Sequence, residues 1–199
     1  MAETLKIEIY RKKQPDELTK ALSEADSRTD IGSGAALTAA TAAAYFLRAA
    51  ALTAEEKGSS EQLDYLCRNG EILRSYMIHL IDEDVKSRGP LRKALKEGDP
   101  RTIDAARQPA AAIANEIINM MNKLLELLKQ LSDVCSEEAM RFAAASADLA
   151  MGAVHACMRY VLDLGAKSSD ETYRYIVRRE NEITLENCRQ NYAKILEKA

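Results

Sequence analysis

The stretch AALTAATAAAYFLRAAALTA, residues 35–54, decides the fold. Apart from Arg48, its residues are small or apolar all the way round a helix, a pattern that is typical of a helix in the core of a bundle or at a contact between subunits. Thr38, Thr41 and Arg48 interrupt the stretch, and it contains no strongly hydrophobic run. It therefore predicts a buried core helix and not a membrane span.

The rest of the chain beyond residue 14 also has helical periodicity. Gly89-Pro90 and Gly98-Asp99-Pro100 predict breaks, and Pro109 predicts a kink or a restart. The sequence thus predicts an all-α fold, an antiparallel bundle of long helices in a single domain that spans residues 1–199. The expected helices cover roughly residues 15–25, 35–56, 60–88, 90–97, 101–132, 136–165 and 168–197.

Length and composition narrow the class of protein. The 199 residues include 28 Lys and Arg against 31 Asp and Glu, and 47% of the residues are apolar. A chain of this length buries about 70% of the surface that it exposes when unfolded, so it needs neither disulfides nor a structural metal. The composition excludes collagen-like, disordered and disulfide-scaffold proteins. A charge of -3 without a basic tail argues against a nucleic-acid partner.

Cysteine usage and the start of the chain bear on the compartment. The cysteines form no C-x-x-C pair and have no histidine at zinc-finger spacing, so they predict buried free thiols. The first residues, MAETLKIEIYRKKQ, carry charges where a signal peptide needs an apolar stretch. We therefore expect a cytoplasmic protein without a membrane segment. The four cysteines are Cys67, Cys135, Cys157 and Cys188.

An acidic cluster ends the helix expected over residues 60–88. Asp84 takes the next position, four residues on, of an apolar stripe in this helix. Burial would raise the pKa of this carboxyl, which prepares a general acid or base. Asp82 lies about 160° away around the helix, so the two acids need not share a site. The alternative is a solvated ion pair between Asp84 and Arg88. The stripe consists of Leu66, Leu73, Met77 and Leu80.

The glycine-containing segment DIGSG, residues 30–34, ends a loop that we expect from Ser27 to Gly34. Exposed N–H groups at a helix start bind a carboxylate or phosphate, and Gly32 and Gly34 would let a ligand approach the backbone closely. The alternative is an ordinary turn in which Ser33 caps the following helix.

A line of polar residues follows one face of the helix expected over 136–165. Asp148, Gly152, His155 and Arg159 are spaced four, three and four residues apart. His79 is the other histidine, but the E-x-x-H pairs of di-iron bundles are absent. We therefore expect these residues to pair with one another in a groove or at an interface. A similar line in the Ala-rich helix contains Thr38, Thr41, Tyr45 and Arg48, where Arg48 could attract an anion or meet an acid across the bundle.

In their order along the chain, these pieces resemble the cyclodeaminase/cyclohydrolase family. It comprises the cyclodeaminase part of formiminotransferase-cyclodeaminase and the small methenyltetrahydrofolate cyclohydrolases. Its pattern is a P-G-G-G-S loop before an Ala-rich helix, I-D-x-D-A-x-A-F at the end of a long helix, a helical Pro, and S-D-A-G opening another Ala-rich helix. The corresponding stretches here are IGSGA (31–35), IDEDVKSR (81–88), Pro109, and EEAM (137–140) with Gly152.

The match covers nearly the whole chain but differs in detail. The paired aspartates, two of the three loop glycines and the helical Pro agree with the family pattern. The loop Pro and Ser differ, Arg88 replaces the aromatic residue, and Glu137-Glu138 stand where the family has S-D.

The resemblance implies a homodimer that acts on a tetrahydrofolate derivative by acid/base chemistry, without a metal. Asp84 would be the leading general acid/base and Asp82 the second. A homodimer is also what the Ala-rich helix predicts. By the resemblance, Gly32, Ser33 and Gly34 would line the folate site, and Arg48, Lys86 and Arg88 would meet the anionic glutamate tail.

Two other functions compete with this one. A non-catalytic one-carbon-folate binding or carrier protein is favoured by the altered loop and by Glu137-Glu138, whereas the retained Asp82 and Asp84 favour the enzyme. A metal-dependent bundle would use His79 and His155. The sequence leaves the roles of Glu137, Glu138, His155 and Arg159 open.

Overall fold

Seven α-helices and one short 3-10 helix are present in the computed structural model, which describes residues 9–199. No strand occurs among these residues. Residues 1–8, where the sequence argued against a signal peptide, lie outside the described part. The elements are η1 (Tyr10–Lys12), α1 (Pro15–Ser23), α2 (Ile31–Lys57), α3 (Glu61–Ser87), α4 (Gly89–Glu97), α5 (Pro100–Ser132), α6 (Glu137–Ala166) and α7 (Glu171–Leu196).

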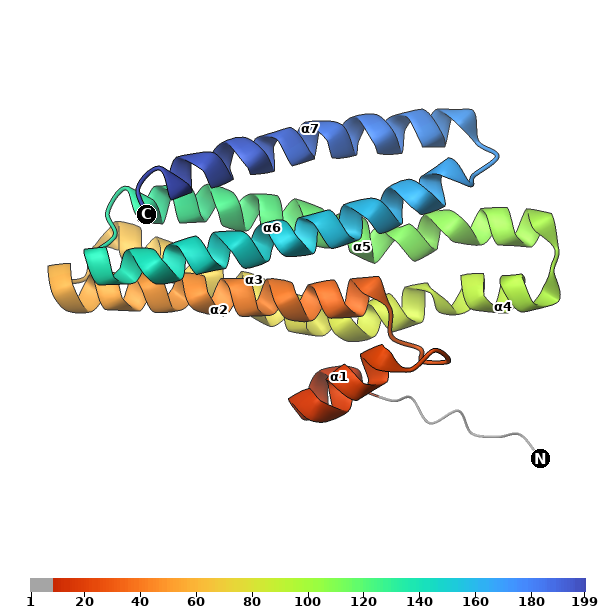
Figure 1. The fold of residues 1–199 in the computed structure, drawn as a ribbon, viewed down its shortest axis with the longest axis horizontal. Coiled ribbons are helices and arrows are strands. Elements are labelled where there is room, and N and C mark those ends of the chain that lie inside the picture. The colour runs from red at the N-terminus through yellow and green to blue at the C-terminus, as the bar shows by residue number, and fades with distance from the viewer. Residues whose placement is uncertain (1–8) are drawn as a thin grey trace.

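The expected all-α bundle is confirmed. Successive long helices alternate in direction, with α4 prolonging α3, and α1 lies beside the bundle near the start of α2 (Figure 1). The Leu-rich face of α5 forms much of the core, with Leu124, Leu125 and Leu128 completely buried. Each such side chain contributes about 1.5–3 kcal/mol of transfer free energy.

Local signals set most of the helix boundaries. α2 and α4 end at Gly58 and Gly98, whose φ angles of 87° and 77° suit glycine. Pro109 lies inside α5, which continues through it without a restart. The helices α3, α5, α6 and α7 are each preceded by a side chain that accepts a hydrogen bond from a backbone N–H of the first turn. These residues are Ser60, Asp99, Ser136 and Asp170.

The start of α2 differs from the expectation. The predicted loop ended at Gly34, but α2 already begins at Ile31, and both glycines lie in its first turn. The N-cap is Asp30, whose carboxylate accepts a 2.6 Å hydrogen bond from the Ile31 backbone N–H. The alternative, with Ser33 as the cap, is therefore also wrong.

The Ala-rich helix α2 packs against α3, α5 and α6. By length and composition it is apolar enough to cross a membrane, but half of that apolar window is buried inside the bundle. Its Phe46 is fully buried and lies against Gly70 of α3, where an added Cβ would come within 2.6 Å of the ring. The apolar character of α2 is thus the one expected for a core helix.

The cysteine prediction holds in part. All four thiols are free, but only Cys157 and Cys188 are buried, whereas Cys67 and Cys135 are half-buried.

Candidate active site

Asp84, at the end of α3, is completely buried, as the apolar stripe predicted. Its Oδ2 accepts two hydrogen bonds from Ser33, from the backbone N–H at 2.9 Å and from the hydroxyl at 2.7 Å. Because Ser33 lies in the first turn of α2, the carboxylate sits at the positive end of that helix dipole. The anion bound at this helix start is therefore the protein's own carboxylate.

Gly32 makes this approach possible. A Cβ at position 32 would lie 2.1 Å from Asp84 Oδ1 and 2.5 Å from its Cγ, distances that no side chain tolerates without movement. Gly34 is different, because a Cβ there would meet only Leu22, at 3.6 Å. The two glycines thus have separate roles, and Gly32 is the one that contacts the acid.

Opposing effects act on the pKa of Asp84. Burial raises it above its ordinary value of 3.8, while the two hydrogen bonds from Ser33 and the charge of Arg92 lower it, and the net direction is upward. The second oxygen, Oδ1, is buried and has no hydrogen-bond partner. A carboxyl group in such surroundings suits proton exchange closer to neutral pH.

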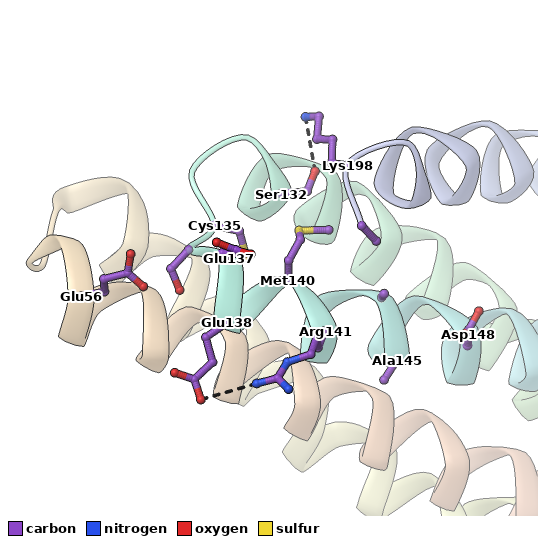
Figure 2. A pocket seen from close by; sticks show the side chains of 13 residues that line it. Glu56, Ser132, Cys135, Glu137, Glu138, Met140, Arg141, Ala145, Asp148 and Lys198 are labelled. Carbon is purple, nitrogen blue, oxygen red and sulfur yellow. Dashed lines mark hydrogen bonds and ion pairs between the residues drawn. The ribbon is translucent and has the colours of Figure 1, made fainter.

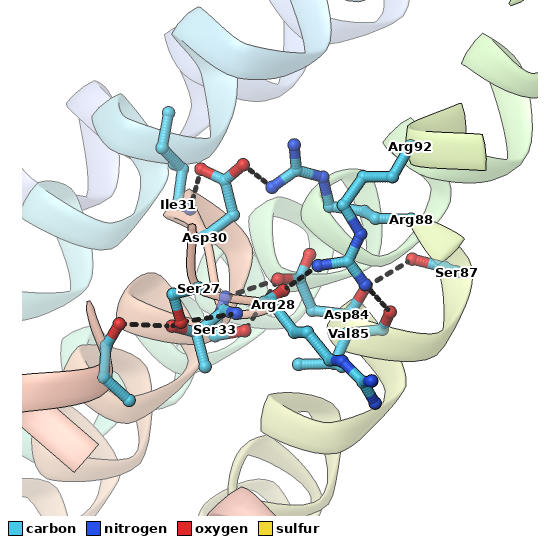
Figure 3. A network of polar contacts seen from close by, with 12 residues as sticks. Ser27, Arg28, Asp30, Ile31, Ser33, Asp84, Val85, Ser87, Arg88 and Arg92 are labelled. Atoms are coloured by element: carbon cyan, nitrogen blue, oxygen red, sulfur yellow. Dashed lines mark hydrogen bonds and ion pairs between the residues drawn. The ribbon is translucent and has the colours of Figure 1, made fainter. Parts of the chain in front are cut away.

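Arg88 does not pair with Asp84, so the alternative interpretation of the acidic cluster is wrong. Its guanidinium forms an ion pair with Asp30, the N-cap of α2 (Figure 3). The guanidinium also lies 5.0 Å from the ring centre of Tyr160 in α6. Its side chain is 14% exposed and that of Asp30 is 33% exposed, whereas Asp84 is fully buried. Burial lowers the pKa of Arg88.

Arg92 reinforces this network from α4. Its guanidinium donates to the carbonyl oxygens of Arg28, at 2.8 Å, and Val85, at 3.3 Å (Figure 3). It thereby ties the segment before α2 to the end of α3.

Asp82 faces another part of the molecule, as the angle around the helix predicted. Its Oδ1 accepts hydrogen bonds from the backbone N–H groups of Tyr10, at 2.7 Å, and Arg11, at 3.3 Å, and its Oδ2 lies 3.4 Å from Arg11 Nε. The carboxylate therefore holds η1 against α3. The structure does not bring Asp82 into the surroundings of Asp84.

Two of the expected cations also lie apart from Asp84. Lys86 is exposed and pairs with Glu83 at 2.7 Å. Arg48 is exposed and lies over the ring of Phe142, 4.8 Å from its centre, so it meets no acid across the bundle. Of the predicted binding residues, the structure gathers Gly32, Ser33 and Arg88 around Asp84.

The histidines occupy separate settings. His79 Nδ1 accepts a hydrogen bond from Arg11 at 2.6 Å, and its Nε2 lies 3.4 Å from Glu83. His155 is exposed on α6. Within residues 9–199, no three His, Cys, Asp or Glu side chains lie close enough together to hold a metal ion.

The polar line on α6 lies at the surface. Gly152, His155 and Arg159 are exposed, and Asp148 accepts a 2.6 Å hydrogen bond from Tyr192 of α7. Within one chain these residues therefore do not pair with one another in a groove, and their pairing at an interface between chains stays a prediction.

A large surface hollow lies at the other end of α2. It has a volume of about 1230 Å³ and is lined by Glu56, Cys135, Glu137, Glu138 and Arg141 among others (Figure 2). Glu56 and Ser33 are 23 residues apart in α2, hence about 35 Å along its axis. We centre the candidate site on Asp84 because the hollow is open and its acids are exposed, whereas Asp84 is buried with its pKa raised.

Sequence reasoning missed Tyr160 and Asp30. Tyr160 lies on the buried face of α6, three residues after Cys157, and a tyrosine in such a pattern usually belongs to the core. Asp30 was placed in the loop, and its partner Arg88 is 58 residues away. No local signal points to either contact.

The fold and this site define an all-α bundle with a buried acid held at a helix start. Residues 15–182 match the family described as formiminotransferase-cyclodeaminase, and the chain belongs to that family. A crystal structure of formiminotetrahydrofolate cyclodeaminase from Thermotoga maritima matches with a TM-score of 0.87 and 20% identity, over 94% of this chain and 96% of that chain. No curated protein matched the chain. Family and fold together support a one-carbon folate enzyme.

The contact between Gly32 and Asp84 predicts a difference between two otherwise similar substitutions. Gly32→Ala should lower the free energy of unfolding by about 1–3 kcal/mol, because the new methyl group displaces the carboxylate. Gly34→Ala, the matched control, should be neutral or stabilising by up to about 1 kcal/mol. Urea unfolding of both variants measures this. Equal effects would show that the close contact is absent in solution.

The raised pKa of Asp84 predicts a pH dependence of stability. The folded chain holds this proton more tightly than the unfolded chain, so the contribution of Asp84 to stability rises as pH falls through its folded pKa and levels off below about 3.8. The free energy of unfolding of the wild type, minus that of Asp84→Asn, should therefore increase from pH 7 towards pH 4. A constant or decreasing difference in urea titrations would contradict the upward shift.

Proposed function

We propose that the chain is a cytoplasmic one-carbon folate enzyme of the methenyltetrahydrofolate cyclohydrolase or formiminotetrahydrofolate cyclodeaminase type, with Asp84 as its general acid/base. The observation that carries the proposal is the buried carboxyl group at the start of α2, whose pKa is raised and whose Oδ1 is unpartnered. The family supports a tetrahydrofolate derivative as the substrate.

Both reactions need a group that moves protons near neutral pH. In the cyclohydrolase reaction, water adds to the amidinium carbon between N5 and N10, the bond from that carbon to N5 breaks, and N5 takes up a proton. In the cyclodeaminase reaction, N10 adds to the formimino carbon and ammonia leaves. Asp84 would accept the proton released on addition and return it to the departing nitrogen. Its negative charge would also stabilise the cationic one-carbon unit.

Access to Asp84 requires movement. The carboxyl group has no exposed surface, so substrate reaches it only after its surroundings move. We propose that Arg88 leaving its ion pair with Asp30 and its place over Tyr160 is that movement. Arg88 would then be free to meet an anionic group of the ligand.

A non-catalytic folate binding protein is the second candidate. The same burial favours it, because Oδ2 is already engaged by Ser33 and the acid is covered. Two assays of purified protein separate the functions. Loss of methenyltetrahydrofolate absorbance and release of ammonia from formiminotetrahydrofolate, each against a buffer control, report the two reactions. Calorimetry with the same folates reports binding without turnover.

Asp84→Asn should lower turnover by about 100-fold or more while folate binding is largely kept, because the amide cannot exchange the proton. Asp82→Asn is the matched control. It weakens the contacts with Tyr10 and Arg11, so it should lower stability and change turnover much less. Steady-state kinetics and calorimetry of both variants measure this. If the wild type binds folates but does not turn them over, the protein is a folate binding or carrier protein and not an enzyme.

We also propose that the protein is a homodimer that associates through the outer face of α2 and α6. On this face Ala44, Tyr45 and Gly152 are exposed in one chain, although the flanking positions of both helices are buried. Ala44 and Gly152 are small and would let a second copy approach closely. Sedimentation at micromolar concentration should give twice the mass of one chain, 22.0 kDa, and a monomer would remove this proposal.

A further inference from the structure

Unpartnered polar atoms gather at one place in the bundle. Among the described residues, four buried side-chain atoms lack a hydrogen-bond partner: Asp84 Oδ1, Arg88 Nε, Tyr160 OH and Asn181 Oδ1. The first three belong to the same cluster, since Arg88 lies over the Tyr160 ring and the charge of Asp84 helps to raise the pKa of Tyr160. Buried polar groups are nearly always paired, and each exception costs stability. Three such unpartnered atoms in one cluster therefore lower the stability of the fold. Hydrogen bonds from a bound ligand would offset that loss.

Tyr160 is the member of this cluster without an assigned role. It lies on α6 and is 8% exposed. Its ring carries the Arg88 guanidinium on one face, 5.0 Å from the ring centre. Burial raises the pKa of Tyr160 and Arg88 lowers it, and the net direction is upward, so the hydroxyl keeps its proton at neutral pH and can donate it in a hydrogen bond.

We propose that Tyr160 is a further substrate-contacting residue, whose hydroxyl donates a hydrogen bond to an acceptor oxygen or ring nitrogen of the bound folate once Arg88 has moved off the ring. The inference rests on the proposed function. Asp84 belongs to α3, and Tyr160 would supply a hydrogen-bond donor from α6. Two different helices of the bundle would then hold the ligand.

A purely structural tyrosine would behave in the opposite way. If the hydroxyl served the fold, its removal would cost stability. Arg88 lies close enough to the hydroxyl to lower its pKa, but a guanidinium only donates, and no acceptor for the hydroxyl proton is present among the described residues. Tyr160→Phe therefore removes a buried donor that nothing satisfies, and it keeps the ring under Arg88. Tyr160→Phe should therefore keep or raise the stability of the protein while it weakens its function.

The test compares Tyr160→Phe with Tyr192→Phe. Tyr192 donates a 2.6 Å hydrogen bond to Asp148 and lies near the end of α7, so its hydroxyl is partnered. Tyr160→Phe should leave the melting temperature equal or higher and lower kcat/KM for the folate substrate about 10- to 100-fold. Tyr192→Phe should lower the melting temperature slightly and leave kcat and KM unchanged. Separate kcat and KM values show whether the contact forms in the bound substrate or in the transition state.

The outcomes separate this inference from the proposed function. If the wild type turns over or binds folates and Tyr160→Phe does so equally well, the role of Tyr160 alone is wrong. A clear fall in the melting temperature of Tyr160→Phe would also overturn it, because the hydroxyl would then serve the fold. If the wild type neither binds nor turns over any folate, the proposed function fails and this inference falls with it.

Discussion

The contact between the Asp84 carboxylate and the first turn of α2 is the constraint on which the rest of the site depends. α2 and α3 form an antiparallel pair, joined at one end by the short segment around Gly58. At the other, open end, Ser33 donates two hydrogen bonds to Asp84, and Gly32 leaves just enough room for the carboxyl group. One carboxylate thus satisfies a backbone N–H of the helix start and closes the pair.

The same contact sets the chemistry. The protein surrounds Asp84 with two donors, which favour its charged form, and with apolar side chains, which disfavour it, and burial dominates. The Asp30–Arg88 ion pair adds a second link at the same end of the bundle, between the N-cap of α2 and the residue that joins α3 to α4. The same carboxylate is therefore both the reactive group and a structural contact, because displacing it from Ser33 would also release the first turn of α2.

Most of the fold follows from the sequence because helix boundaries and faces are local properties. The stripe that ends at Asp84 and the angle that separates it from Asp82 are examples, and the structure confirms both. The exact start of α2 could not be predicted, because it depends on a distant residue. Gly32 and Ser33 are helical, and the backbone N–H of Ser33 donates a hydrogen bond to the carboxylate of Asp84, 51 residues away. Likewise, charge alone suggested Arg48 and Lys86, whereas tertiary packing places them elsewhere and brings Asp30 and Tyr160 to the site.

The geometry also changes what the family resemblance can be taken to mean. Gly32 and Asp84, both at positions where the chain keeps the family pattern, touch each other, so packing alone is enough to require them and their presence does not distinguish an enzyme from a binding protein. The informative position is one that differs. Where the family pattern has an aromatic residue, Arg88 lies over the Tyr160 ring and pairs with Asp30. Asp84 has no exposed surface, so it can exchange a proton with a substrate only after its surroundings move. The end of α3, where Arg88 replaces the aromatic residue, is therefore the place at which this chain's difference from the family pattern bears on catalysis.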